Sequence, residues 1–260
     1  MGTMGMAVVP IVTPVKFPPE LTDFEGWTET KRILVILAHP DDPEFFCGAS
    51  LIRWATLGHE IYYCLLTTGQ KGSQEKEVNP EGIAKIRRLE QQEAADYIGV
   101  KGVEFLDYND GELFPDFQMR KELVQVIRRC SPQIIITSDP QNYVTLENRI
   151  NHPDHRAAGE AVLGAAFPAA GNGQFTIQGK SQLNSMLVNP EEVWLSATNQ
   201  PNLVIDISAY YEQKISAISC HRSQIGEKAE FFKRMNSRSY VDPDSGKKLF
   251  IERFKRAILH

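Results

Sequence analysis

The chain has 260 residues, of which 42% are hydrophobic and 23% charged, and its formal net charge is −5. These proportions are typical of a folded globular protein and exclude a disordered chain. The acidic balance argues against a nucleic-acid partner, which requires a clustered basic face. The longest uncharged, mainly apolar stretch, 161–170, is too short to span a membrane.

The first thirty residues are rich in proline and contain no basic region followed by an apolar run and a cleavage site. We expect 1–30 to form an extended arm, because the residue before a proline is pushed away from helical geometry. The four cysteines include no CxxC pair and are too few for a disulfide scaffold. We therefore expect a cytoplasmic, reducing location.

From Lys31 onward, strand and helix patterns alternate. The continuous apolar run at 33–37 predicts a strand buried on both faces. Further strands are expected at 60–67, 103–107, 133–137, 193–196 and 203–207, and helices at 44–57, 83–98, 117–130, 154–167 and 208–221. The alternation predicts an α/β fold, with a Rossmann-like, doubly wound, mostly parallel sheet and helices on both faces. Without a break in composition, 31–260 is expected to be one domain, and the insertion at 168–190 is a candidate lid.

The first site motif follows the strand at 33–37 and reads Ala38-His-Pro-Asp-Asp-Pro-Glu44. It is neither a dinucleotide fingerprint nor a phosphate loop, yet ligands bind beyond the carboxyl ends of parallel strands. His39 and Asp42 are three residues apart, and an imidazole with a carboxylate suits Zn²⁺. Asp41 would then remain free as a base. The ordinary alternative is that Asp42 only caps the next helix.

The second motif, Asn151-His-Pro-Asp-His155, follows the strand at 133–137. His152 and His155 can face one pocket, although Asp154 could simply stabilise a helix N-terminus. The two strands are expected to be neighbours at the switch point of the sheet, so their loops should converge. His39, Asp42 and one of the two later histidines would give three ligands and an open fourth position, as in catalytic zinc sites.

These motifs resemble the LmbE-like, or PIG-L, family of zinc-dependent de-N-acetylases, whose signature is AHPDD-x-E followed by HPDH. The resemblance continues in order through 67–72, 87–100, 105–111 and 214–224. Within the family, the chain is most similar to archaeal enzymes that act on N-acetylated chitin disaccharide. It departs from the family pattern at Phe46 and Ala49, where glycines are frequent, and at Gln70, which replaces an acid.

The resemblance implies that His39, Asp42 and His155 hold one Zn²⁺ per chain, which lowers the pKa of bound water toward about 7. It implies that Asp41 is the general base and that a protonated His152 stabilises the oxyanion.

The remaining implied roles concern Asp154, Arg87 and Asp110. Asp154 would orient His152 or raise its pKa by opposite charge. Arg87 and Asp110 would contact the sugar hydroxyls or an appended group, although a solvated helix charge and a plain turn dipeptide are the alternatives. The role of His221 stays open.

The expected function is therefore hydrolysis of the acetamide of an N-acetylglucosamine-type substrate, with a small-molecule amino sugar as partner. An amidase for a thiol-glycoside conjugate, a non-catalytic carbohydrate-binding subunit with a metal, and a two-metal phosphatase are the rivals. A homo-oligomer is also expected, with the arm and the 168–190 segment as candidate contacts.

Overall fold

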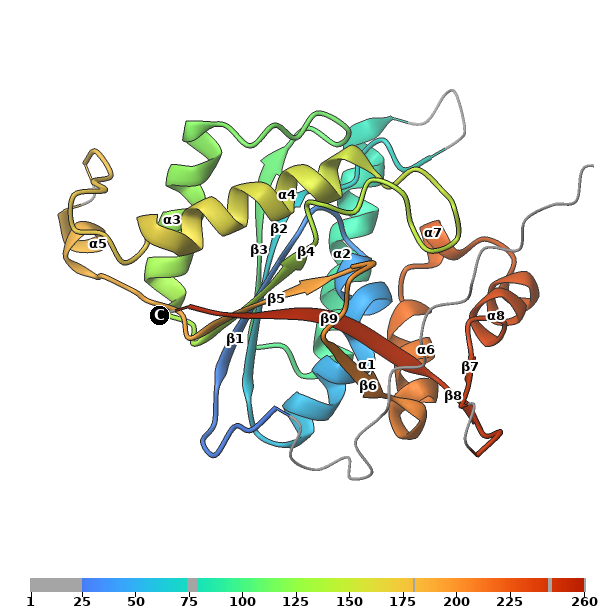
Figure 1. Ribbon diagram of the computed structural model, residues 1–260. Helices are drawn as coiled ribbons and strands as arrows, with labels where there is room; N and C mark the ends of the chain where they lie inside the picture. The colour runs from blue at the N-terminus through green and yellow to red at the C-terminus, as the bar shows by residue number, and fades with distance from the viewer. Residues whose placement is uncertain (1–24, 74–78, 180, 243–244, 260) are drawn as a thin grey trace, which may run out of the picture.

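The computed structural model describes residues 25–73, 79–179, 181–242 and 245–259. Most of the proline-rich arm at 1–30 lies outside these residues. Figure 1 shows one sheet that crosses the molecule between two groups of helices. The sheet has seven strands, so the expected α/β architecture with a single sheet core is confirmed.

The strand order is β3-β2-β1-β4-β5-β9-β6. The strands are β1 (Arg32–Leu37), β2 (Glu60–Thr67), β3 (Gly102–Tyr108), β4 (Ile134–Ser138), β5 (Glu192–Ser196), β6 (Leu203–Asp206) and β9 (Ile251–Ile258), and β7 (Tyr240–Val241) pairs with β8 (Lys248–Leu249) separately. The first five strands of the main sheet are mutually parallel, as expected.

Side chains of β1 enter both cores in alternation. Ile33, Val35 and Leu37 pack in the core on one face of the sheet, whereas Leu34 and Ile36 pack in the core on the other face. This is the burial on two faces that a continuous apolar strand predicts.

The helices are α1 (Asp42–Thr56), α2 (Pro80–Ile98), α3 (Phe117–Cys130), α4 (Pro153–Gly164), α5 (Ser181–Ser185), α6 (Tyr211–Ile218), α7 (Arg222–Ile225) and α8 (Lys228–Asn236).

The chain reverses its direction of winding between β1 and β4. β1 pairs in parallel with β2 on one side and with β4 on the other. The expected neighbourhood of these two strands is therefore confirmed, and the loops after β1 and β4 leave the sheet side by side at its carboxyl edge.

Three elements differ from the sequence-based expectation. Residues 222–260 had no assigned strand, yet β9 inserts antiparallel between β5 and β6. The expected helix at 208–221 is a 3₁₀ turn at Ser208–Tyr210 followed by α6 and α7. The expected helix at 154–167 ends at Gly164, and a π-helical turn that contains Pro168 follows, because proline cannot continue an α-helix.

The described part of the 168–190 segment packs beside α3. The guanidinium of Arg128 on α3 donates to the carbonyls of Ala169, Ala170 and Leu183. The segment follows the C-terminal end of α4, whereas His155 lies in the first turn of that helix. The segment therefore lies away from the two motifs and does not form the lid that we expected.

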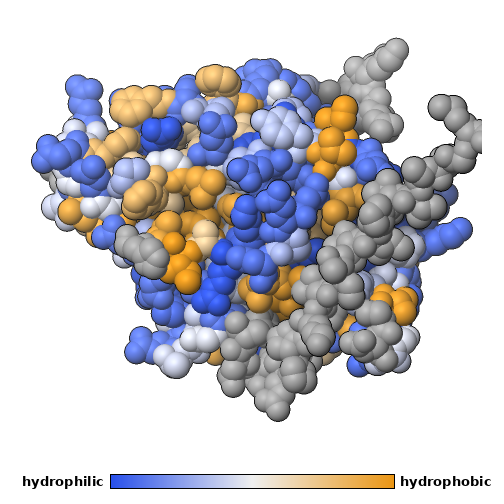
Figure 2. All heavy atoms as spheres, in the orientation of Figure 1, coloured by the Kyte–Doolittle hydropathy of each residue, from blue (hydrophilic) through white to orange (hydrophobic). Residues whose placement is uncertain are grey.

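The face of the molecule in Figure 2 is mainly hydrophilic, with apolar side chains scattered across it.

The end of the expected arm packs on the body of the protein. The ring centroid of Trp27 lies 5.5 Å from that of Trp54 and 5.3 Å from that of Trp194. Among the described residues, no helix is both long and apolar enough to cross a membrane.

Candidate metal centre

The turn after β1 places its two aspartates in different settings. Helix α1 begins at Asp42, and its N-cap is Asp41, whose side chain makes no capping hydrogen bond. The alternative considered for Asp42, that it only caps this helix, is therefore wrong, because the cap lies one residue earlier. The carboxylate of Asp42 therefore does not cap the helix and instead contacts His39 and His155.

Asp42 connects the two motifs. Its Oδ1 lies 3.1 Å from Nε2 of His155, and its Oδ2 lies 3.3 Å from Nδ1 of His39. Oδ2 also accepts the backbone N–H of His39 at 2.8 Å, which fixes the carboxylate. The carboxylate of Asp42 therefore lies between the two histidines that the resemblance named with it as metal ligands.

The start of α4 holds the two histidines of the second motif. Nδ1 of His155 lies 3.1 Å from Oδ1 of Asn151, so Nε2 is turned toward Asp42. The helix can begin this close to β4 because of Gly159, where a Cβ atom would lie 2.1 Å from the carbonyl oxygen of Ser138.

His152 is the N-cap of α4, and its Nδ1 accepts the backbone N–H of Asp154 at 3.2 Å. The proton of the neutral ring is therefore on Nε2. Burial and the nearby charges of His39 and His155 lower the pKa of His152. The expectation of a cationic His152 is thus not supported, but its Nε2–H remains a hydrogen-bond donor.

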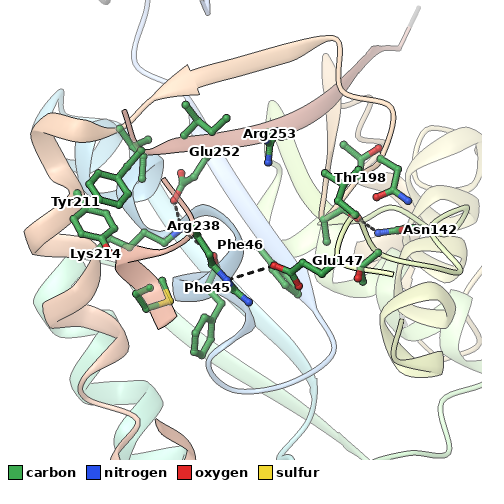
Figure 3. Close-up of a pocket in the computed structure, with 18 residues that line it drawn as sticks. Phe45, Phe46, Asn142, Glu147, Thr198, Tyr211, Lys214, Arg238, Glu252 and Arg253 are labelled. Atoms are coloured by element: carbon green, nitrogen blue, oxygen red, sulfur yellow. Dashed lines mark hydrogen bonds and ion pairs between the residues drawn. The ribbon is translucent and has the colours of Figure 1, made fainter. Parts of the chain in front are cut away.

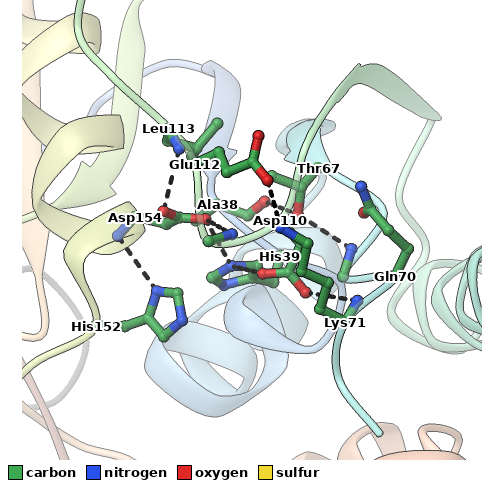
Figure 4. Close-up of polar contacts among 12 residues, drawn as sticks. Ala38, His39, Thr67, Gln70, Lys71, Asp110, Glu112, Leu113, His152 and Asp154 are labelled. Atoms are coloured by element: carbon green, nitrogen blue, oxygen red, sulfur yellow. Dashed lines mark hydrogen bonds and ion pairs between the residues drawn. The ribbon is translucent and has the colours of Figure 1, made fainter. Parts of the chain in front are cut away.

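Two further carboxylates converge on His39 from the other side (Figure 4). Nε2 of His39 lies 3.2 Å from Asp110 and 3.3 Å from Asp154. Asp154 also accepts the backbone N–H groups of Gly111 and Leu113. Asp154 was expected to orient His152, yet its carboxylate is directed at His39 and only its N–H reaches His152.

The electrostatics of this cluster are dominated by its carboxylates. Burial disfavours a charged His39, but hydrogen bonds with Asp110, Asp154 and Asp42 outweigh it and hold the pKa of His39 well above its usual value. Burial likewise opposes ionisation of Asp42, but the charge of His155 and the hydrogen bonds from both rings lower its pKa below its usual range. The cluster therefore concentrates negative charge that attracts a cation.

Asp41 lies beside a buried guanidinium. Nη2 of Arg87 lies 3.3 Å from Oδ2 of Asp41 and donates to the carbonyl of Pro40 at 2.7 Å, and Nη1 donates to the carbonyl of Gly69 at 2.8 Å. Burial raises the pKa of Asp41 to about 6, although the charge of Arg87 opposes this.

The structure therefore differs from the expectation that Arg87 and Asp110 contact substrate. Arg87 is only 4% exposed, and the chain is built closely around it, since a Cβ atom at Gly69 would lie 2.0 Å from its Nη1. Both oxygens of Asp110 are engaged as well, one by His39 and the other by the backbone N–H of Lys71. Each side chain is committed to protein groups that shape the site.

The donor set fits a divalent cation. His39, His152 and His155 each offer a ligand atom within 4.8 Å of the others, as do His39, Asp110 and Asp154. Imidazole nitrogens with a carboxylate oxygen are a usual ligand set of Zn²⁺. A carboxylate on the far nitrogen of a ligating histidine is also the usual arrangement around such ions. Asp110 and Asp154 hold that position on His39.

Sequence reasoning missed three residues that hold the site together. Asn151 orients His155, Gln91 contacts the backbone of Asp41, and Glu44 contacts Gln91. Only Glu44 had a signal, because it ends the AHPDD-x-E motif. Gln91 lies in the middle of α2, and nothing in its neighbourhood along the chain distinguishes it from a solvated glutamine.

A cavity of about 430 Å³ lies next to the cluster, at the carboxyl edge beyond β4, β5 and β9 (Figure 3). None of the predicted site residues lines it. The two sites share Phe46, which lines the cavity and meets the ring of His155 edge-on at 5.3 Å between centroids. Aromatic side chains (Phe45, Tyr211, Phe250) and polar ones (Asn142, Thr198, Arg253) form much of its wall.

The chain is similar to several known proteins. The chain is 34% identical to the diacetylchitobiose deacetylase of Thermococcus kodakarensis over 78% of this chain and 73% of that protein. It is 28% identical to a probable N-acetyl-alpha-D-glucosaminyl L-malate deacetylase 2 of Bacillus cereus, over 75% and 84% of the two chains.

Among solved structures, the N,N'-diacetylchitobiose deacetylase of Pyrococcus horikoshii in complex with an inhibitor superposes with a TM-score of 0.76 and 25% identity. The match covers 92% of this chain and 88% of that one. The family model of PIG-L, GlcNAc-PI de-N-acetylase, matches residues 34–166, a span that contains both histidine motifs. The chain is therefore a member of the PIG-L family of de-N-acetylases.

Proposed function

We propose that the protein hydrolyses the acetamide group of an N-acetylglucosamine-type sugar, with one zinc ion held by His39, Asp42 and His155. The observation that carries this proposal is the shared carboxylate of Asp42, which lies within 3.3 Å of a ring nitrogen of both histidines. The names of the deacetylases similar to this chain support the choice of an amino sugar as substrate.

A bound zinc ion supplies a Lewis acid and lowers the pKa of a water molecule toward about 7. Asp41 is the general base: it takes a proton from the attacking water and later gives it to the amine nitrogen as the C–N bond breaks. Acetate and the free amino sugar are the products.

His152 acts as the electrophilic donor in this proposal. Because its Nδ1 is occupied by the N–H of Asp154, its Nε2–H is available for the carbonyl oxygen as negative charge develops there. A neutral ring is sufficient for this role, which is compatible with the lowered pKa of His152.

We place the rest of the substrate, beyond the acetamido sugar, in the cavity that Phe46 separates from His155. Its aromatic and polar lining suits the faces and hydroxyls of a sugar ring. A disaccharide should therefore have a lower KM than N-acetylglucosamine. Equal KM values for the disaccharide and N-acetylglucosamine would contradict the placement of the second sugar in this cavity.

Two further expectations remain proposals. All four cysteines are free, which supports a reducing compartment such as the cytoplasm. Met186 and Leu187, which directly follow α5, and Phe167, in the turn after α4, are exposed apolar side chains, which supports a homo-oligomer through the 168–190 segment. Light scattering on the purified protein tests the second point, and a monomer at micromolar concentration would contradict it.

The test of the proposed function is acetate release from N-acetylglucosamine, its oligomers, and lipid- or thiol-linked derivatives, with the Asp41→Asn variant as control. The proposal predicts release by the wild type and little by the variant. The absence of acetate from every acetamido sugar, with zinc bound, would contradict it.

A further inference from the structure

The base in this site has an unusual backbone. Asp41 has a φ of 81°, in the left-handed region that residues other than glycine rarely adopt. Aspartate tolerates this region better than most residues, but its side chain makes no capping hydrogen bond that would favour it here. Such conformations persist where the surrounding structure holds them in place.

The direct hold on this backbone is a buried glutamine. Oε1 of Gln91 accepts the N–H of Asp41 at 2.9 Å, and Gln91 is 0% exposed. The carbonyl of Asp41 accepts the N–H of Phe45 at 3.0 Å, which is the first turn of α1. The peptide that carries the base is therefore fixed on both sides.

A second group fixes the orientation of the glutamine amide. Nε2 of Gln91 donates to both carboxylate oxygens of Glu44, at 3.1 and 3.2 Å. A reversed amide would point its NH₂ at the N–H of Asp41 and its oxygen at a carboxylate, which are two repulsive contacts. The carboxylate of Glu44 thus sets which atom of Gln91 faces Asp41.

Glu44 is in turn fixed from two other elements. It is 0% exposed, and it lies 3.2 Å from the hydroxyl of Tyr63 on β2 and 3.0 Å from Nε2 of His221 before α7. The chain of contacts runs from His221 through Glu44 and Gln91 to the backbone of Asp41. Every member beyond Asp41 is buried, so none of them touches a substrate.

We propose that Gln91, oriented by Glu44 and His221, is a positioning residue that holds the backbone of Asp41 in its left-handed conformation and so aims the catalytic carboxylate. The inference rests on the proposed function, because it assumes that Asp41 is the base. It assigns a role to His221, which the sequence left open.

The test is a set of variants at positions 91 and 44, with steady-state kinetics on an acetamido sugar and zinc content measured for each. Gln91→Leu should lower kcat about 10- to 100-fold, as expected for a misplaced catalytic group, with KM and zinc content close to wild type. Gln92→Leu is the matched control, because Gln92 is exposed and its amide donates to Asp96 on the same helix, and it should leave kcat unchanged.

A charge-conserving exchange separates positioning from general damage to the fold. Gln91→Glu alone sets two buried carboxylates against each other. Gln91→Glu combined with Glu44→Gln restores a donor at position 44 and an acceptor at position 91. The double variant should exceed the single one in kcat by about tenfold, within the range seen for residues of one hydrogen-bond network.

The outcomes are distinct. A folded, zinc-loaded Gln91→Leu protein with kcat within twofold of wild type overturns the inference. If that variant does not fold, the absence of any gain in the double variant overturns it. A wild type that releases no acetate contradicts the proposed function, whereas an active wild type with an unaffected Gln91→Leu variant contradicts only the positioning role.

Discussion

Two buried charge clusters lie along α1, one beyond its N-terminus and one at its kink, and they are built in different ways. The Glu252 cluster joins β9 to the kink in α1 at Cys47, where the helix has non-helical backbone angles. The His39 cluster consists of His39, Asp42, Asp110, Asp154 and His155, beyond the N-terminus of the helix.

In the Glu252 cluster, protein donors occupy both carboxylate oxygens. Oε1 accepts from the N–H of Ala49 at 3.0 Å and from Nζ of Lys214 at 2.6 Å, while Oε2 accepts from the N–H and hydroxyl of Ser50 at 2.9 and 2.5 Å. Lys214 also donates to the carbonyl of Phe45, two residues before the kink. The charge of Glu252 is paired with that of Lys214, and both of its oxygens accept hydrogen bonds from the protein. This cluster therefore stabilises the fold and needs no ligand.

The His39 cluster does not balance in this way. Three carboxylates approach one imidazole, and among the described residues no lysine or arginine side chain forms an ion pair with Asp42 or Asp154. Buried charges in proteins are paired or coordinate metals. Buried charge alone therefore does not identify a functional site. An excess of buried negative charge among side chains that are good metal ligands does.

The largest effect is expected from removal of Asp42, the carboxylate that contacts both His39 and His155. Asp42→Ala should abolish stoichiometric zinc binding and lower kcat/KM by more than about 100-fold, the upper range for loss of an outer partner of a metal ligand. Zinc content by mass spectrometry and acetate release check this. A variant that keeps one zinc ion and normal turnover would show that the ion is held elsewhere.

A second variant separates metal binding from proton transfer. Asp41→Asn should keep its zinc ion but lose about 10²- to 10⁴-fold in kcat, the usual contribution of a general base. The measurement is again zinc content beside turnover. Loss of the zinc ion in this variant would make Asp41 a ligand rather than the base.

The Glu252 cluster should respond in stability and not in zinc content. Glu252→Gln leaves the charge of Lys214 buried without its partner, which should cost about 3–5 kcal/mol in the free energy of unfolding. Adding Lys214→Met should restore part of that loss. Urea denaturation of both variants measures the effect, and a loss of zinc from folded Glu252→Gln would show that the two clusters are not independent.

The smallest expected effect concerns Arg87. Because its charge lowers the pKa of Asp41, Arg87→Met should raise that pKa further above about 6. A carboxylate base works only above its pKa, so the acid limb of kcat/KM should move to higher pH, with little change in KM at alkaline pH. A large rise in KM without this shift would return Arg87 to the role of a substrate contact.

Much of the fold and of the metal centre could be predicted because their signals are local. The apolar run at 33–37, the glycine at 99 that ends α2 with a φ of 93°, and the two histidine motifs at strand ends all depend on neighbours in sequence. The convergence of the motifs followed from one topological rule, that loops meet where the sheet reverses its winding.

The parts that escaped prediction depend on partners far along the chain. β9 mixes charged and apolar residues without a regular alternation, and the burial of Glu252 is explained only by Lys214 and the kink in α1. Arg87 and Gln91 look like solvated helix residues until the turn at Pro40 and Asp41 is packed against them. The hydrophobic periodicity of α2 gives no sign of that contact.

The most direct test of the central claim is a zinc titration of the chelator-treated protein, with acetate release from an acetamido sugar as the readout. The account predicts negligible activity without metal, followed by a linear recovery that ends at one zinc ion per chain. Full activity in the metal-free protein, or a recovery that ends at two ions per chain, would contradict it.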